Sequence, residues 1–215
     1  MSTIERVVTS GVFSLDGQDF DVENNVWLVG DSRQVIVVDA AHDAHRILDA
    51  VGGRDVVAVV STHGHNDHIT AVADVVDATG APVYLHPADR MLWDAVWGPG
   101  SPGAGRAPDP LALDDGQVLS VAGLDLRVLH TPGHSPGACS LHVPDLGAVL
   151  TGDTLFKGGP GATGRSFSSF PLILASIRAS LLSLPEDTRV LTGHGDATSI
   201  GDEARDWDDW VTRGH

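Results

Sequence analysis

The chain has 215 residues, 42% of them hydrophobic, and it carries 13 Lys and Arg against 29 Asp and Glu, a formal net charge of −16. This balance repels a phosphate backbone and argues against nucleic acid as a partner. The sequence shows one cysteine, no long apolar run and no leader-like N-terminus, so we expect a cytoplasmic protein without intrachain disulfides or membrane contact. With no internal repeat, residues 1–215 are expected to form a single domain.

Apolar strands alternate with amphipathic segments along the chain. β-Branched and apolar runs predict strands at residues 22–29, 35–38, 56–60, 83–85, 124–129, 138–142, 148–150 and 190–191. Apolar residues at helical spacing predict helices at residues 42–51, 69–78, 87–96, 172–184 and 200–212. Such a mixture is typical of an α+β fold in which sheets are sandwiched between helices.

One long segment shows neither pattern. Residues 98–110 are rich in Gly and Pro and follow Trp93 and Trp97. A segment of this length is either a lid over a site or a surface linker.

The most informative segment is Thr-His-Gly-His-Asn-Asp-His at residues 62–68, which follows the predicted strand 56–60. Alternate residues of an extended chain point to the same side, so His63 and His65 can bind one ion. Asp67 and His68 begin a helical pattern and face another direction, so they can serve a second ion. A lone histidine is usually a surface residue, but three histidines and one aspartate within six residues indicate a metal site.

Three further candidates stand at the ends of other predicted strands. His134 lies in a turn whose prolines and glycines fix the backbone. Asp153 follows strand 148–150, where a helix cap is the alternative to a metal ligand. His194 lies between two glycines after strand 190–191. With the histidine segment, these residues give seven candidate ligands from four loops, enough for two ions that share one carboxylate.

Four motifs together resemble those of a known family. The histidine segment, Thr-Pro-Gly-His at 131–134, Gly-Asp-Thr-Leu-Phe at 152–156 and Gly-His-Gly at 193–195 resemble, in this order, the motifs of the metallo-β-lactamase fold superfamily, and particularly its glyoxalase II-like hydrolases. The resemblance runs from about residue 25 to residue 194. It implies a four-layer αββα sandwich with two divalent ions in a cleft at one edge of the sheets. Zinc is the expected metal, and iron or manganese are the alternatives.

The resemblance also implies a role for each candidate. The first ion would be bound by His63, His65 and His134, the second by Asp67, His68 and His194, and Asp153 would bridge the two. Asp67 and Asp153 are therefore the carboxylates that we expect to take part in catalysis.

Two residues outside the ligand set are assigned by the same resemblance. Asp39, after the predicted strand 35–38, matches an aspartate that supports ligand histidines, although a plain turn residue is the alternative. Arg165 resembles a basic residue that contacts carboxylates of the thiol carrier, here after an insertion of residues 158–163. Both assignments predict that the side chain lies beside the candidate metal ligands.

The implied reaction is hydrolysis by a hydroxide that bridges the two ions. Coordination lowers the pKa of water from about 15.7 to about 7, so no serine or cysteine nucleophile is required. Cys139, in an apolar stretch, is expected to be a buried core thiol. The expected substrate is the thioester of a low-molecular-weight thiol, with glutathione, mycothiol and coenzyme A all open, because the helical domain that grips glutathione in full-length glyoxalase II enzymes has no counterpart in residues 195–215.

Other activities of the same fold stay open. Persulfide dioxygenases retain most of these ligand positions but use one iron, and a lactone or ester offers a carbonyl similar to that of a thioester. A non-catalytic metal-binding module is a third class. β-Lactamase activity is disfavoured, since some subclasses place a metal-binding cysteine where Asp153 stands, and nuclease activity is disfavoured by the absence of a basic or aromatic face. His42 and His130 lack ligand company, a structural hydrogen bond being expected for His130, and the oligomeric state cannot be read from the sequence.

Overall fold

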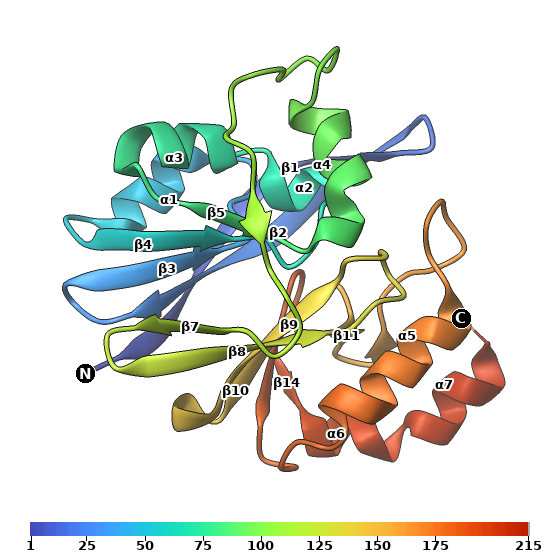
Figure 1. Ribbon diagram of the computed structural model, residues 1–215. Coiled ribbons are helices and arrows are strands. Elements are labelled where there is room, and N and C mark those ends of the chain that lie inside the picture. Colours follow the sequence, from blue (N-terminus) through green and yellow to red (C-terminus); the bar gives the residue numbers. More distant parts are fainter. Residues whose placement is uncertain (215) are drawn as a thin grey trace.

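The computed structural model describes residues 1–214 and consists of two mixed sheets packed face to face, with helices on both outer faces (Figure 1). The first sheet has the strand order β1-β2-β3-β4-β5-β6 and the second the order β14-β13-β10-β9-β8-β7, while β11 and β12 form a separate hairpin. The expected αββα sandwich is therefore confirmed.

The elements have the following bounds. The first sheet contains β1 (Thr3–Leu15), β2 (Gln18–Gly30), β3 (Gln34–Val38), β4 (Asp55–Val60), β5 (Val83–Leu85) and β6 (Leu111–Ala112). The second contains β7 (Val118–Val121), β8 (Leu124–His130), β9 (Cys139–Val143), β10 (Ala148–Gly152), β13 (Arg189–Thr192) and β14 (Thr198–Ser199), and the hairpin contains β11 (Leu155–Phe156) and β12 (Gly159–Pro160). The helices are α1 (Ala44–Val51), α2 (Asn66–Ile69), α3 (Val72–Thr79), α4 (Arg90–Trp97), α5 (Phe170–Ser176), α6 (Ile200–Arg205) and α7 (Trp207–Arg213), with the 3₁₀ turns η1 (Pro87–Asp89) and η2 (Pro144–Leu146) and the π-helical turn η3 (Ile177–Leu181).

Three apolar clusters hold the four layers together. The cluster between the sheets includes Val38 and Leu126 with Cys139, all fully buried. A second cluster joins the first sheet to α1, α3 and α4, and a third joins the second sheet to the helices of residues 170–214. Each buried branched side chain stabilises the fold by about 1.5–3 kcal/mol, so these interfaces position the loops at the sheet edge firmly.

The predicted strands are all present, and the largest omission is β1. It pairs with β2 over its whole length through the two-residue turn Asp16-Gly17, in which both residues have a positive φ. An Asp-Gly pair is a strong hairpin signal, so the turn was readable from the sequence. The polar residues of β1 concealed the strand because much of it is exposed at the sheet edge.

Two of the five predicted helices are interrupted, 69–78 between α2 and α3 and 200–212 at Asp206. The predicted helix 87–96 begins as the 3₁₀ turn η1 and continues as α4, and 172–184 is formed by α5 and the π-helical turn η3, which ends at Leu181. The helix predicted at 42–51 begins two residues late, at Ala44. The predicted helix 200–212 divides at Asp206 into α6 and α7, and Trp210 of α7 is buried within the third apolar cluster. Helical periodicity in the sequence does not show such a break, because both parts keep an apolar face. In the part of the chain that the structure describes, no helix has the length and apolarity needed to cross a membrane.

Candidate metal centre

The order of the strands brings the candidate ligands to one edge of the sandwich. β3 runs parallel to β4, and β10 runs parallel to β13. Because the carboxyl ends of parallel neighbours lie at the same edge, the segments after these strands meet there. Asp39 follows β3, residues 62–68 follow β4, Asp153 follows β10, and His194 follows β13.

The first group of candidate ligands contains three histidines. The Nδ1 atom of His65 lies 3.0 Å from the Nε2 atom of His63 and 3.0 Å from the Nε2 atom of His134. All three side chains are buried, and the three nitrogen atoms are close enough to bind one ion. His63 and His65 come from the loop after β4, and His134 comes from the turn between β8 and β9.

The second group contains one carboxylate and two histidines. The Nε2 atoms of His68 and His194 are 3.3 Å apart. The Oδ2 atom of Asp67 lies 3.3 Å from Nε2 of His194 and 3.6 Å from Nε2 of His68. These three atoms form another set that could hold an ion.

Asp153 lies between the two groups. Its Oδ1 atom is 3.3 Å from Nε2 of His68, and its Oδ2 atom is 3.4 Å from Nε2 of His194. The same Oδ2 atom is 3.6 Å from Nε2 of His134, which belongs to the first group. The structure thus brings all seven predicted ligands together, with the Asp153 carboxylate in contact with both groups.

Hydrogen bonds on the far side of the rings fix which nitrogen carries the proton. His68 donates from Nδ1–H to Oδ2 of Asp39 at 3.0 Å. The Thr62 hydroxyl donates to the same carboxylate oxygen at 2.8 Å, which leaves its own oxygen to accept from Nδ1–H of His63 at 3.1 Å. The Nε2 atoms of both histidines therefore face the cluster, and each offers a lone pair to a metal ion when its ring is neutral, as metal-binding imidazoles require.

Backbone carbonyl groups hold two further rings in the same way. His134 donates from Nδ1–H to the carbonyl oxygen of Ala162 at 2.8 Å, and His194 donates to that of Glu23 at 2.7 Å. Asp39, for which a plain turn role was the alternative, also accepts the backbone N–H of Thr62 at 2.7 Å. It contacts one candidate ligand directly and a second through Thr62.

The electrostatics of the cluster keep the carboxylates charged. Burial lowers the pKa of His63 well below its usual value and that of His65 to about 3, so both rings are neutral. Burial opposes ionisation of Asp153, but His68 and His194 hold the pKa of its carboxyl well below the usual range. In turn, and against the effect of burial, Asp153 raises the pKa of His194 to about 10.

These features fit a divalent cation in each group. Oδ1 of Asp67 and Oδ1 of Asp153 are buried without a hydrogen-bond partner in residues 1–214. Neutral imidazole nitrogens and charged carboxylates facing one another are a donor set for zinc, iron or manganese. A cation would supply the positive charge that protons on His68 and His194 otherwise provide.

Two residues that the sequence analysis left without a role support the second group. Asn24, fully buried, donates from Nδ2 to Oδ2 of Asp67 at 3.1 Å and accepts from Nε2–H of His42 at 2.8 Å. The available signal was the polar pair Asn24-Asn25 inside a buried strand, since a buried amide needs a partner. The partners lie 18 and 43 residues away in sequence, so the sequence could not identify them.

Arg165 lies beside the first group. A small pocket of about 40 Å³ is lined by Phe13, Leu15, His65, His134, Ala162, Arg165, Ser166 and Ser168. The Arg165 guanidinium lies 4.7 Å from the centre of the Phe20 ring and donates to the Gln18 side chain at 3.2 Å. The tip of the β1–β2 hairpin therefore holds this arginine at the pocket.

The structure also places residues 98–110, His130 and Cys139. Gly103 packs against Trp97, and the Ser101 hydroxyl donates to the carbonyl oxygen of Val96 at 2.7 Å, so this segment lies against α4 and does not line the pocket beside His65. His130 donates to the carbonyl oxygen of Pro136, a structural hydrogen bond as expected. Cys139 is fully buried, also as expected.

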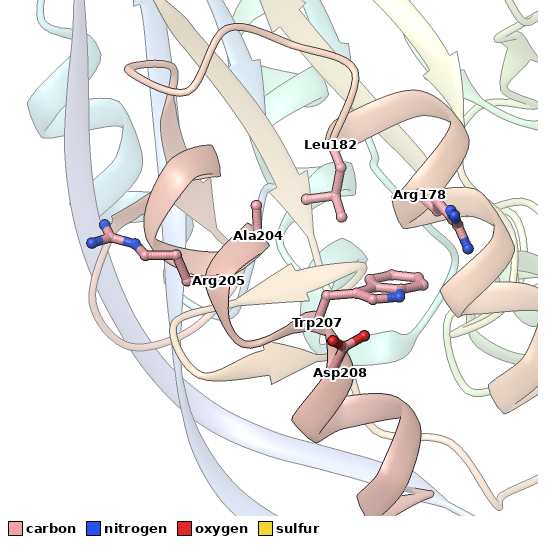
Figure 2. A pocket seen from close by; sticks show the side chains of 6 residues that line it. All are labelled: Arg178, Leu182, Ala204, Arg205, Trp207 and Asp208. Carbon is pink, nitrogen blue, oxygen red and sulfur yellow. The ribbon is translucent and has the colours of Figure 1, made fainter.

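A larger hollow, of about 460 Å³, lies between η3, α6 and α7. Figure 2 shows the side chains around it. Its lining consists of Arg178, Leu182, Ala204, Arg205, Trp207 and Asp208. The Arg178 guanidinium lies 5.7 Å from the centre of the Trp207 ring. No candidate ligand lines this hollow, so it lies apart from the chemistry described above.

Comparison with known proteins agrees with this geometry. The model of the metallo-beta-lactamase superfamily matches residues 20–194. The chain belongs to this superfamily. The probable metallo-hydrolase YqgX of Bacillus subtilis is 35% identical over 187 residues, 83% of this chain and 88% of the relative. The hydroxyacylglutathione hydrolase GloC of Haemophilus influenzae is 29% identical over 188 residues, 84% and 88% of the two chains.

Solved structures of superfamily members are similar over nearly the whole chain. The B3 metallo-beta-lactamase BLEG-1 has a TM-score of 0.77 at 29% identity and covers 92% of this chain and 97% of its own. TTHA1623, in a di-iron-bound form, has a TM-score of 0.75 at 35% identity and covers 86% and 93%. The relatives of this chain thus include a probable metallo-hydrolase, a hydroxyacylglutathione hydrolase and a metallo-beta-lactamase, and one similar structure holds two iron ions.

Proposed function

We propose that the protein hydrolyses the thioester of a low-molecular-weight thiol in a reaction that depends on two divalent metal ions. The observation that carries the proposal is the Asp153 carboxylate, which lies within 3.6 Å of histidine nitrogens from both ligand groups. A carboxylate in this position suits two neighbouring cations. The similarity to GloC, a hydroxyacylglutathione hydrolase, supports a thioester as the substrate.

Zinc is the metal that we propose, and iron is the alternative because TTHA1623 has been obtained with two iron ions. His63, His65 and His134 would hold one ion, Asp67, His68 and His194 the other, and Asp153 would contact both. A bound divalent ion acts as a Lewis acid and lowers the pKa of water to about 7, which supplies a nucleophile at neutral pH.

The residues around the cluster prepare it for this chemistry. Asp39 and Thr62 keep ring protons on the outward-facing nitrogens of His68 and His63, so that lone pairs face inward. Asn24 donates to Asp67 and thereby orients its carboxylate. Because these groups are held by buried hydrogen bonds, little reorganisation is needed when metal and substrate bind.

Arg165 is proposed to contact a carboxylate of the thiol carrier. It lines the pocket beside His65 and His134, where Phe20 and Gln18 hold its guanidinium. Phe13 gives the pocket an apolar wall. The small volume of the pocket, about 40 Å³, favours a short acyl group.

The test is a panel of thioesters with one short acyl group on glutathione, coenzyme A and a sugar-linked thiol, together with the matching oxygen ester. Release of free thiol is measured on protein whose metal content has been quantified. We expect metal-dependent thiol release, abolished together with metal occupancy in Asp153→Asn. The exposed Asp145→Asn is the matched control and should behave as wild type.

Two outcomes would contradict a hydrolase that depends on two metal ions. One is an Asp153→Asn protein that keeps two metal ions and full turnover. The other is a wild-type protein that binds a single iron, consumes oxygen and forms sulfite from a persulfide, since it would then be a dioxygenase of the same fold. Cleavage of the oxygen ester alone would replace the thioester by a lactone or ester as the substrate class.

A further inference from the structure

Asp89 is a buried carboxylate to which nothing above assigns a role. It directly precedes α4, at a position where an aspartate usually caps the helix with its side chain. Its side chain makes no such cap and is fully buried. Some other interaction must therefore compensate the burial of this group.

The compensation comes from the two loops that carry the three-histidine group. Oδ2 of Asp89 accepts the backbone N–H of Gly64 at 2.9 Å and the Ser135 hydroxyl at 2.6 Å. Oδ1 accepts the backbone N–H of Gly137 at 2.5 Å. Gly64 stands between His63 and His65, and Ser135 follows His134 directly, so one side chain ties together the backbones of both loops.

All three donors to Asp89 are neutral. Within residues 1–214, no ion pair joins this carboxylate to a basic side chain, and its oxygens make none of the contacts that define the two ligand groups. Hydrogen bonds to an ionised acceptor are stronger and more directional than those between neutral groups. The carboxylate is thus placed to fix geometry and is not placed to bind a metal ion.

The packing around Asp89 explains why Gly64 and Gly137 lack a side chain. A Cβ atom on Gly64 would lie 3.1 Å from the backbone oxygen of Asp89 and 2.8 Å from Cβ of Leu92. A Cβ atom on Gly137 would lie 2.8 Å from Cγ of Asp89. Neither glycine has a positive φ, so close packing requires them and backbone conformation does not: Leu92 and Asp89 approach Gly64, and Asp89 approaches Gly137.

We propose that Asp89 is a positioning residue that holds His63, His65 and His134 at the spacing needed to bind an ion. This inference rests on the metal centre of the proposed function. It predicts that loss of the Asp89 charge weakens the three-histidine site selectively, because the second group is supported by other residues, Asp39 and Asn24.

The experiment compares Asp89→Asn, Ser135→Ala and Glu203→Gln with wild type. Glu203 is a matched control, since it is also a buried carboxylate that accepts only neutral donors, from Gly158 and Thr198. Metal-free protein is titrated with Co²⁺ in competition with a chelator, and the absorption bands of the bound ions are recorded. His134→Ala identifies the bands of the three-histidine site, and thermal unfolding of the metal-free proteins reports on the fold.

In Asp89→Asn, one of the two Co²⁺ affinities should fall about 10–100-fold, with changes in the bands of the three-histidine site. Ser135→Ala should give a smaller loss at the same site, and Glu203→Gln none. Unchanged affinities and bands in Asp89→Asn, with only a lower melting temperature, would overturn the proposal. An equal loss in Glu203→Gln would do the same.

Two results need a separate interpretation: a variant that does not fold and a protein that binds metal without cleaving a thioester. If Asp89→Asn does not fold, Ser135→Ala decides, since unchanged Co²⁺ affinity in that variant would overturn the proposal and a selective loss would support it. No substrate is used, so a protein that binds Co²⁺ as described but cleaves no thioester refutes the proposed function and leaves the role of Asp89 standing.

Discussion

The substitution Asp39→Asn examines how far the metal centre depends on residues that do not bind metal. Oδ2 of Asp39 accepts from both His68 and the Thr62 hydroxyl, and Oδ1 accepts the backbone N–H of Thr62. An amide can keep the last bond through its oxygen, but its NH₂ group then faces two donors. Two hydrogen bonds are lost. The ring proton of His68 loses its acceptor, and the Thr62 hydroxyl that accepts from His63 is no longer oriented by Asp39.

The expected change in melting temperature follows from the loss of metal affinity. Loss of such a supporting partner lowers metal affinity about 10–100-fold, or about 1.4–2.8 kcal/mol. At a fixed free metal concentration, the stabilisation of the folded protein by metal falls by the same amount. For a chain of this length, about 1 kcal/mol corresponds to about 2–4 °C, so the rise in melting temperature on adding metal should shrink by about 3–11 °C.

The assay measures the melting temperature with and without saturating Zn²⁺ for wild type, Asp39→Asn and Asp31→Asn. Asp31 is the matched control because it also follows a strand and accepts two backbone N–H groups, from Arg33 and Gln34, but it contacts no candidate ligand. Its substitution should leave the metal-induced rise unchanged. If Asp39→Asn lowers both melting temperatures equally, Asp39 stabilises the turn only and the reasoning is refuted.

Three further predictions concern the surroundings of the site. Arg165→Ala should raise KM about 10-fold or more while leaving kcat nearly unchanged, because a charge-assisted hydrogen bond to the bound substrate is lost without change at the reacting atoms. Steady-state kinetics that show a reduced kcat at unchanged KM would contradict this. Burial raises the pKa of the Cys139 thiol well above its usual value, so folded protein at pH 8 should resist alkylation by iodoacetamide while unfolded protein reacts, as mass spectrometry can determine. Gly137→Ala should lower the free energy of unfolding, measured in urea, by about 1–3 kcal/mol, since its Cβ atom would press on Asp89. An unchanged free energy of unfolding would mean that the segments carrying Gly137 and Asp89 can move apart without cost.

The sequence by itself determined which residues gather at the site. Ligand-type side chains follow strands that are recognisable as apolar runs, and chemistry that needs imidazoles and carboxylates places them in short motifs such as residues 62–68. The strands that precede three of these segments, β4, β10 and β13, were therefore predicted correctly. Strand positions can be predicted from the sequence because a strand with both faces covered consists of consecutive apolar, mostly β-branched residues, as in β4.

The tertiary structure alone decided how those residues are supported, and which carboxylates are candidate ligands and which ones support the ligands. Asp39 and Asp89 both stand next to turns, where a local role is the ordinary expectation, yet their oxygens accept from residues 23 to 48 positions away. Asn24 and His42 act in the same way. A hydrogen bond between distant segments leaves no periodic or local signature, because it depends on how the loops meet once both sheets have packed. The break of the predicted helix 200–212 at Asp206 likewise has no periodic signature, because α6 and α7 both keep an apolar face.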